Sequence, residues 1–325
     1  MIPPEFEKRL QQIFAEQIAT RVLASMRNPK LIALWENPLA RHKNTVVTVA
    51  QLCADLQLAP AAPVAAGLPG CWQVSAQQRD AIMHHPAVSA GDIYPINPSS
   101  LFAALTLDVQ PGDEVLDLAA APGGKSLVLA AALSIDGSPT GRLALVEPVK
   151  PRFFRLRANM ERCGVLQADY YQRDGRGVGA AVGERFDRVL LDAPCSSEAR
   201  FHVSNPDSFT HWSLRKVREC ARKQKSLLRS AFRALKPGGT LVYCTCSFAP
   251  EENEKIIASL LRREPLAGLQ SVAVPEDMAD RVQSGLAQWE GRPVDCEAAL
   301  RVLPDALWDG FFLAKIRKQS GSESG

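Results

Sequence analysis

Two cysteines stand at the ends of two predicted strands, and their placement suits covalent chemistry. Cys195 closes the string Asp192–Cys195, and Cys246 lies in the string Tyr243–Ser247. A third strand, turn and helix, Val115–Ser126, precedes both. Ligands bind at the edge of an open parallel sheet where such strand ends meet. We therefore expect two thiols beside a nucleotide-type cofactor, an arrangement suited to attack on an electron-poor ring. The alternative is a pair of buried structural thiols.

The turn Pro122–Lys125 follows a predicted strand and opens a helix. Gly123 and Gly124 let the backbone approach a ligand, and the free amides of a helix start favour an anionic group. Glu147 ends the next strand, where an acid commonly holds the ribose hydroxyls of a nucleotide. Its alternative role is that of an acid at a helix N-terminus. The third glycine of a dinucleotide fingerprint and the P-loop string are both missing, which argues against NAD and nucleoside triphosphates.

A further acid, Asp174, closes the third predicted strand and is a candidate to accept a hydrogen bond from an adenine amino group. Asp169 competes for this role, and a plain turn residue before Gly175 is the alternative for Asp174.

Strands and helices alternate from about Pro111, which predicts a parallel sheet covered on both faces. The predicted strands are Glu114–Leu118, Leu143–Val146, Tyr170–Arg173, Arg188–Leu191 and Thr240–Tyr243. The predicted helices are Lys125–Leu133, Pro151–Cys163 and Arg215–Leu235. Two later segments, Arg301–Pro304 and Phe311–Ile316, are expected to form an antiparallel pair.

The N-terminal part differs in pattern. Apolar residues from Phe6 to Met26 recur at helical spacing and predict one amphipathic helix. We expect a small RNA-binding-type α+β module over residues 1–90, a catalytic domain over residues 91–318 and a disordered tail over residues 319–325.

Composition narrows the class of protein. The chain has 325 residues, 46% of them hydrophobic and 22% charged, without an apolar run long enough to span a membrane. Eight scattered cysteines and an N-terminus without a signal-peptide pattern predict reduced thiols in the cytoplasm. No Cys/His pair with zinc spacing accompanies Cys244 and Cys246, so we expect no metal.

The formal net charge is only +3, but nine Lys or Arg and a single acid fall between His211 and Lys236. This stretch is either a solvated helix face or a surface that contacts phosphates.

Several strings together resemble the RNA cytosine-5 methyltransferases of the NOL1/NOP2/Sun (RsmB/RsmF-like) family. Leu116–Lys125 is similar to its motif I, Asp192–Ser196 and Tyr243–Ser247 to its two cysteine motifs, and Pro250–Glu254 to the segment that follows. The likeness runs from about Gly91 to Lys318. It implies a Rossmann-like, seven-stranded class I methyltransferase sheet and S-adenosyl-L-methionine as cofactor. By position, the implied cofactor-binding residues are Ala119, Ala120, Ala121, Pro122, Gly123, Gly124, Lys125, Glu147, Arg152, Asp174 and Asp192.

The resemblance also implies catalytic roles. Cys246 would add to carbon 6 of cytosine, which makes carbon 5 nucleophilic, and Cys195 would assist release of the methylated product. Asp192 would hydrogen-bond N3, and Lys125 would orient this cluster unless it is a solvated helix-start lysine. The implied partner is ribosomal RNA, with transfer RNA as the alternative, and we expect a monomer.

One departure from the family pattern affects the predicted pocket. Ser196–Arg200 stands where the family usually has glycines, which stiffens a loop beside the base. The aromatic residues that follow are expected either to line the entrance for an extruded base or to pack locally. They are Phe201, His202, Phe209 and Trp212.

Three other functions remain open from the sequence. A methyltransferase of exocyclic amino groups usually carries Asp/Asn-Pro-Pro-aromatic where this chain has Pro194 and Cys195. A DNA cytosine-5 enzyme would use Cys195 as nucleophile and leave Cys246 dispensable. A non-catalytic RNA-binding or assembly factor with the same fold would need neither thiol.

Overall fold

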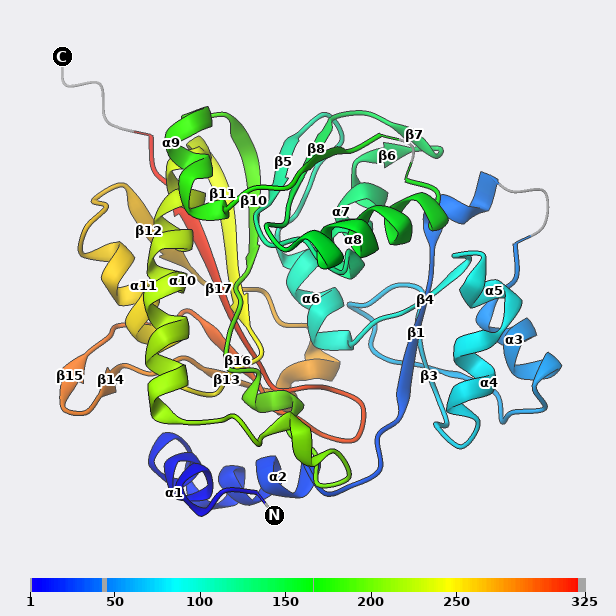
Figure 1. The fold of residues 1–325 in the computed structure, drawn as a ribbon, viewed down its shortest axis with the longest axis horizontal. Coiled ribbons are helices and arrows are strands. Elements are labelled where there is room, and N and C mark those ends of the chain that lie inside the picture. Colours follow the sequence, from blue (N-terminus) through cyan, green and yellow to red (C-terminus); the bar gives the residue numbers. More distant parts are fainter. Residues whose placement is uncertain (1, 43–45, 166, 321–325) are drawn as a thin grey trace.

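The computed structural model describes residues 2–42, 46–165 and 167–320 (Figure 1). Within these ranges one sheet of nine strands has the order β13-β16-β17-β11-β10-β5-β8-β9, with β12 paired to β17. Its strands are β5 (Glu114–Asp117), β8 (Arg142–Val146), β9 (Asp169–Tyr171), β10 (Phe186–Asp192), β11 (Leu235–Thr245), β12 (Ala267–Gln270), β13 (Val282–Ser284), β16 (Leu300–Val302) and β17 (Phe311–Lys318). The predicted α/β class is confirmed.

The predicted strands are all present, and the details differ in two ways. β11 begins at Leu235, five residues before the predicted start, because Leu235 pairs with Phe186 of β10. The sheet also exceeds seven strands in the described residues, because β12 and β16 both pair with β17, along different parts of its length. The expected antiparallel C-terminal pair is confirmed as β16 and β17.

Helices cover the sheet on both sides (Figure 1). One side carries α6 (Pro98–Thr106), α7 (Gly124–Ala132) and α8 (Lys150–Arg162), and the other carries α9 (Val178–Val182), α10 (Leu214–Ala234) and α11 (Glu254–Leu261). Strands enclosed in this way are apolar on both faces: Val189, Leu190 and Leu191 of β10 are fully buried. α10 buries a stripe that includes Val217, Leu228 and other small or apolar residues, and its remaining face is charged.

The register of the parallel strands brings the site residues to one edge of the sheet. Leu190 of β10 lies beside Asp117 of β5, and Asp192 of β10 lies beside Cys244 of β11. Because parallel strands end at the same edge, the segments that follow β5, β10 and β11 leave the sheet side by side. This is the edge at which the sequence predicted the cofactor and the thiols.

A second, smaller sheet has the order β2-β3-β1-β4, with strands β1 (Ile32–Glu36), β2 (Ala62–Pro63), β3 (Cys71–Val74) and β4 (Ile93–Pro95). It packs with α3 (Val49–Asp55), α4 (Arg79–His84) and α5 (Pro86–Ser89) around its own apolar cluster. β4 lies beyond residue 90, so this sheet extends past the predicted boundary. The division of function between residues 1–90 and 91–318 stays a prediction.

The N-terminal segment is two helices, α1 (Pro4–Ile13) and α2 (Glu16–Ser25), so the prediction of one helix was wrong. Phe14 and Ala15 between them are extended. This break places the ring of Phe14 against Phe248, with centroids 5.8 Å apart. Both helices contribute buried residues to the large apolar cluster, and neither contributes to the cluster that packs with α3, α4 and α5. Residues 321–325 of the predicted tail lie outside the described residues.

Two of the aromatic residues after Cys195 belong to the core, so they do not line a base entrance. Phe201 and Phe209 are buried and contact each other, with ring centroids 6.0 Å apart. Phe6 of α1 fills the space beside them, 5.0 Å from Phe201 and 5.3 Å from Trp212. Local packing is therefore the correct interpretation for these rings.

No helix in the described ranges is long and apolar enough to cross a membrane.

The aromatic cluster predicts a stability effect. Replacing Phe6 with Ala removes a fully buried ring between α1 and the segment after Cys195, and we expect the free energy of unfolding to fall by about 3–5 kcal/mol. Denaturant unfolding monitored by circular dichroism measures it. Phe154→Ala is the control, because Phe154 is half exposed and its loss should change little. Equal effects for the two variants would contradict the packing role.

Candidate active site

A cleft of about 460 Å³ opens where β5, β10 and β11 end. It brings together segments far apart in the sequence: the turn after β5, the start of α8, the loop after β10 and the end of β11. The lining residues are Ala119, Ala121, Pro122, Arg152, Arg155, Asp192, Ala193, Pro194, Cys195, Ser197, Arg200 and Cys246. Seven of the residues predicted from sequence lie in this wall: Ala119, Ala121, Pro122, Arg152, Asp192, Cys195 and Cys246.

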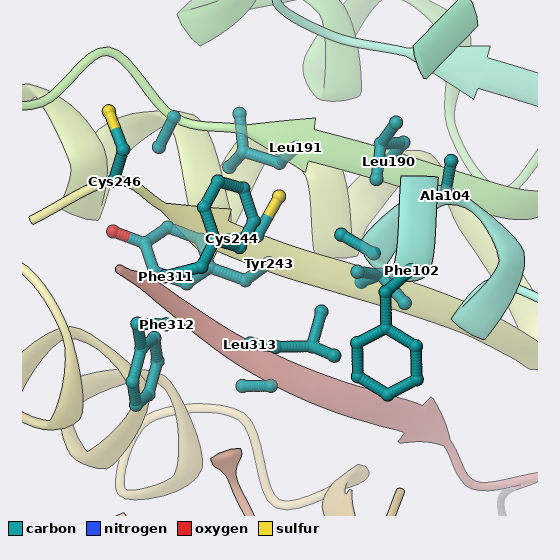
Figure 2. Close-up of a cluster of buried hydrophobic side chains, with 14 of the residues drawn as sticks. Phe102, Ala104, Leu190, Leu191, Tyr243, Cys244, Cys246, Phe311, Phe312 and Leu313 are labelled. Carbon is teal, nitrogen blue, oxygen red and sulfur yellow. The ribbon is translucent and has the colours of Figure 1, made fainter. Parts of the chain in front are cut away.

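The two thiols face each other in this cleft. Cys195 Sγ and Cys246 Sγ are 3.3 Å apart, at hydrogen-bonding distance for sulfur. Figure 2 shows Cys244 within β11 and Cys246 just past its end, at the margin of the packed cluster that contains Tyr243 and Phe311. Cys246 is 6% exposed, and Cys195 is half-buried. The two cysteines are thus a contacting pair at the cleft, and not separate core thiols.

Their surroundings shift the pKa values of the two thiols in opposite directions. The hydrogen bond from Cys195 lowers the pKa of Cys246 to about 7, against the opposing effect of burial and with help from the Arg200 guanidinium. The same bond, together with burial, raises the pKa of Cys195 well above its usual value. Because the thiolate is the nucleophilic form, these pKa shifts favour Cys246 over Cys195 as the thiolate of the pair.

Lys125 and Asp192 form an ion pair beside the thiols. Lys125 Nζ donates to Asp192 Oδ2 at 2.7 Å and to Ser100 Oγ at 2.9 Å. Burial would lower the pKa of Lys125, but the neighbouring Asp192 carboxylate and Cys244 outweigh it and leave the pKa raised. Lys125 is therefore a buried, charged residue, and the alternative of a solvated helix-start lysine is wrong. The sequence did not single out Ser100 as its partner.

The turn after β5 is held by a buried carboxyl. Asp117 Oδ2 accepts a hydrogen bond from Ser126 Oγ at 2.7 Å, which ties the end of β5 to α7. Burial raises the pKa of Asp117 to about 6. Gly123 has a φ of 113°, a conformation that a side chain would strain, and a Cβ there would meet Leu156 at 3.1 Å. This backbone can therefore present its amides to a ligand in a way that other residue types would hinder.

Glu147 lies beyond the end of β8 and is 1% exposed. Its Oε1 accepts from the backbone N–H of Val149 at 2.9 Å, which fits the alternative role at a helix start. Its Oε2 lies 3.6 Å from Arg152 Nη2, which also donates to the carbonyl of Ala121 at 2.8 Å. Glu147 and the turn after β5 are thereby linked through one guanidinium.

The two candidate acids of the third strand lie in different places. Asp169 is the first residue of β9, lies beside Ala144 in the middle of β8 and pairs with Arg142, outside the cleft wall. Its competing role as an adenine-binding residue stays a prediction. Asp174 follows the end of β9, is exposed and pairs with Arg176, and it is not part of the cleft wall.

Two residues of the loop after Cys195 were missed by the sequence analysis. Ser197 has a φ of 58°, a conformation that favours glycine, and its Oγ lies 4.0 Å from Cys195 Sγ. Arg200 lines the cleft, and the negative charge of Cys246 raises its pKa. The signal that could have identified them was the departure at Ser196–Arg200, which the sequence analysis interpreted only as a stiffer loop. A strained backbone such as that of Ser197 persists where the surroundings enforce it, commonly at functional sites.

No group of three or more His, Cys, Asp or Glu among the described residues is arranged to hold a metal ion.

A class I methyltransferase fold with two thiols at its ligand-binding edge agrees with comparisons to known proteins. Residues 104–317 match the family of 16S rRNA methyltransferases RsmB/F. The chain belongs to this family.

Curated relatives include enzymes named for both ribosomal and transfer RNA. The chain is 32% identical over 324 residues to ribosomal RNA small subunit methyltransferase F of Vibrio campbellii, covering 97% of this chain and 64% of that protein. It is 38% identical over 233 residues to tRNA (cytosine(49)-C(5))-methyltransferase of Pyrococcus abyssi, covering 71% of each. The chain thus spans about two thirds of the length of the curated relatives that it matches.

A solved methyltransferase homologue from Pyrococcus horikoshii has the same fold. It superposes with a TM-score of 0.74 at 28% identity, covering 96% of this chain and 93% of the other.

The thiol pair predicts a pH profile for alkylation. With iodoacetamide and peptide mass spectrometry, Cys246 should react with a midpoint near pH 7, because its thiolate is the favoured form above its pKa of about 7. Cys195→Ala and Arg200→Gln should each move the midpoint upward, since each removes a group that stabilises the thiolate. Arg155→Gln, on the same cleft wall, is the control. Unchanged midpoints in the first two variants would contradict the assignment.

Proposed function

We propose that this chain methylates carbon 5 of cytosine in RNA, with S-adenosyl-L-methionine as the donor. The observation that carries the proposal is the contact between Cys195 and Cys246 in the cleft that the turn after β5 also lines. An ordinary methyl transfer to oxygen or nitrogen needs no thiol, whereas carbon 5 of cytosine must first be activated. Membership of the RsmB/F family supports the same reaction.

The chemistry starts from the Cys246 thiolate. Its sulfur forms a bond to carbon 6, and the displaced electron pair makes carbon 5 nucleophilic and builds negative charge toward N3. We assign Asp192 to meet that charge at N3. Because Asp192 is the carboxylate of an ion pair, the proton for this hydrogen bond is supplied by Lys125 Nζ, which donates to Asp192 Oδ2. The donor supplies an electrophilic methyl group. After carbon 5 carries the methyl group, a base or a base-activated water takes its proton. The electron pair of that C–H bond restores the double bond between carbons 5 and 6, and the carbon–sulfur bond breaks with its electron pair returning to Cys246 as thiolate.

The unequal sulfurs support Cys246 as nucleophile and Cys195 as the residue that assists release. A thiol with a raised pKa keeps its proton, so Cys195 can donate a hydrogen bond to the other sulfur but is a poor nucleophile. In the DNA-type assignment Cys195 is the attacking residue, so Cys195 would need the lower pKa of the two cysteines. A non-catalytic RNA-binding factor would not need two thiols in contact, one of which favours the thiolate form.

The residues present fit a nucleotide-type donor. The backbone at Gly123 can approach a ligand, and Glu147 is a buried carboxylate that lies 3.6 Å from the guanidinium of Arg152. We assign the donor site to Ala119–Lys125, Glu147, Arg152 and Asp192, with Asp174 at its outer end. The ribose hydroxyls are the groups that suit Glu147.

The RNA partner is proposed from charge and exposure. The exposed basic residues of α10 are Arg215, Lys216, Arg218, Arg222, Lys223, Lys225 and Arg233. They lie on the face of α10 away from the sheet, where phosphates can reach them. We assign both α10 and the module of residues 1–90 to holding RNA around the target base. Ribosomal RNA is the proposed substrate, with transfer RNA as the alternative that the P. abyssi relative favours.

Replacing the two cysteines should separate the stages of the reaction. Cys246→Ala should abolish transfer of labelled methyl groups to RNA, because no sulfur remains to activate the ring. Cys195→Ala should instead accumulate a protein–RNA adduct that survives denaturing gels. Cys220→Ala, on α10, is the control and should retain activity. Normal turnover by Cys246→Ala would overturn the mechanism, and an adduct that needs Cys195 would favour the DNA-type assignment.

Donor binding gives a separate prediction. Glu147→Gln should weaken S-adenosylhomocysteine roughly tenfold in calorimetric titrations, the effect expected when a charged hydrogen-bond acceptor is lost. Asp169→Asn removes the same charge at a residue that pairs with Arg142 outside the cleft wall, and it should leave the affinity unchanged. Equal affinities for wild type and Glu147→Gln would show that Glu147 serves only the start of α8.

A further inference from the structure

Two buried carboxyl groups lie behind the cysteine loops, and the reaction described above uses neither. Glu198 follows Cys195 by three residues, and Glu252 belongs to the Pro250–Glu254 string. They are 1% and 0% exposed. No Lys or Arg among the described residues forms an ion pair with either carboxylate. Their partners are backbone amides, hydroxyls, an indole and a carboxamide, so hydrogen bonds alone balance their burial.

Glu252 binds the residues that directly follow both cysteines. Its Oε2 accepts from the backbone N–H of Ser196 at 2.9 Å and from Gln224 Nε2 at 2.8 Å. Its Oε1 contacts Ser196 Oγ, and it lies 3.0 Å from Ser247 Oγ. One carboxyl group therefore spans the loop after β10 and the end of β11.

Glu198 holds the second of these loops from the other side. Its Oε2 accepts from the backbone N–H groups of Phe248 and Ala249 at 2.9 and 3.0 Å, and lies 3.1 Å from Ser247 Oγ. Its Oε1 accepts from Trp212 Nε1 at 2.8 Å. Ser247 Oγ is thus placed between two carboxyl groups.

The hydroxyl groups of Ser196 and Ser247 carry too few protons to satisfy all their contacts if both carboxyl groups are ionised. Ser247 and Ser196 bring one hydroxyl proton each, yet their oxygens make four close contacts: one between themselves, two with Glu252 and one with Glu198. With both carboxyls charged, the two hydroxyl protons leave two of the four contacts with lone pairs facing each other. Each proton added to the carboxyl pair supplies one of these contacts, so the geometry favours a protonated carboxyl. Burial raises the pKa of both groups, that of Glu252 to about 7, in the direction that this count requires.

We infer that Glu252 is a positioning residue: with a proton shared with Glu198, it holds Ser196 and Ser247 together and so sets the contact between Cys195 and Cys246. The inference is tested below by alkylation and by kinetics, and its kinetic test rests on the proposed function. The other titratable groups that sense the charge of Glu252 are Cys195, Cys220 and Tyr243, each of which it makes harder to deprotonate.

Glutamine and leucine at position 252 separate the hydrogen bonds from simple packing. Glutamine carries an acceptor for Ser196 N–H and a donor for the hydroxyls, so it imitates the protonated acid. Leucine fills a similar volume without hydrogen bonds. Glu251→Leu is the matched control, because Glu251 pairs with Arg9 and, among the described residues, its side chain forms no hydrogen bond with the cysteine loops.

The first readout needs neither RNA nor donor. Glu252→Leu should move the alkylation midpoint of Cys246 upward by about one pH unit, a tenfold change in thiolate equilibrium, because the hydrogen bond from Cys195 is loosened. Glu252→Gln and Glu251→Leu should keep the wild-type midpoint. Should Glu252→Leu fail to fold, Ser247→Ala removes the shared hydroxyl and should shift the midpoint in the same direction. Identical midpoints in a folded Glu252→Leu and wild type would overturn the inference.

The second readout is kinetic. Glu252→Leu should lower kcat for methyl transfer roughly tenfold to a hundredfold, the effect of misplacing a reacting group, with KM for RNA unchanged. Glu252→Gln should restore kcat, and an equally impaired Glu252→Gln would contradict the shared proton. A wild-type protein that transfers no methyl group, but whose midpoint still shifts on Glu252→Leu, would disprove the proposed function and leave the positioning role intact.

Discussion

The site depends on the parallel register of β10 and β11. Because Asp192 lies beside Cys244, the loop that carries Cys195 and the strand end that carries Cys246 leave the sheet together, and their sulfurs come to 3.3 Å. A shift of one residue would turn one of these side chains to the other face. The fully buried strands and the helices on both sides hold that register, and the chemistry is confined to the edge where the pairing stops.

Charge around this edge is arranged in two layers. Facing the cleft, Arg200 favours negative charge on Cys246, and beside it Lys125 pairs with Asp192. Behind the loops, no Lys or Arg of the described residues pairs with Glu198 or Glu252, and burial favours a protonated carboxyl. A carboxyl pair that keeps a proton fixes the loops and opposes the thiolate in front of it less than two carboxylates would. The layer in front therefore favours the thiolate, and the layer behind holds the loops in place.

Much of the fold and part of the site could be predicted from the sequence. Alternating strands and helices identified the central sheet, and the strings around Cys195 and Cys246 located the thiols, because these patterns are local. The break at Phe14 and Ala15 could not be predicted, since it depends on packing against Phe248, which is distant in the sequence. The partners of Lys125 and the role of Glu252 are likewise set by tertiary contacts and not by spacing.

The most direct test of the account is to identify the sulfur that bonds to RNA. RNA in which cytosine carries fluorine at carbon 5 cannot lose a proton there, so an enzyme that adds to carbon 6 and transfers the methyl group stays attached. Digestion and mass spectrometry of the trapped complex then identify the modified peptide. We predict the nucleotide on Cys246. Attachment to Cys195, or no attachment with an active enzyme, would contradict the account.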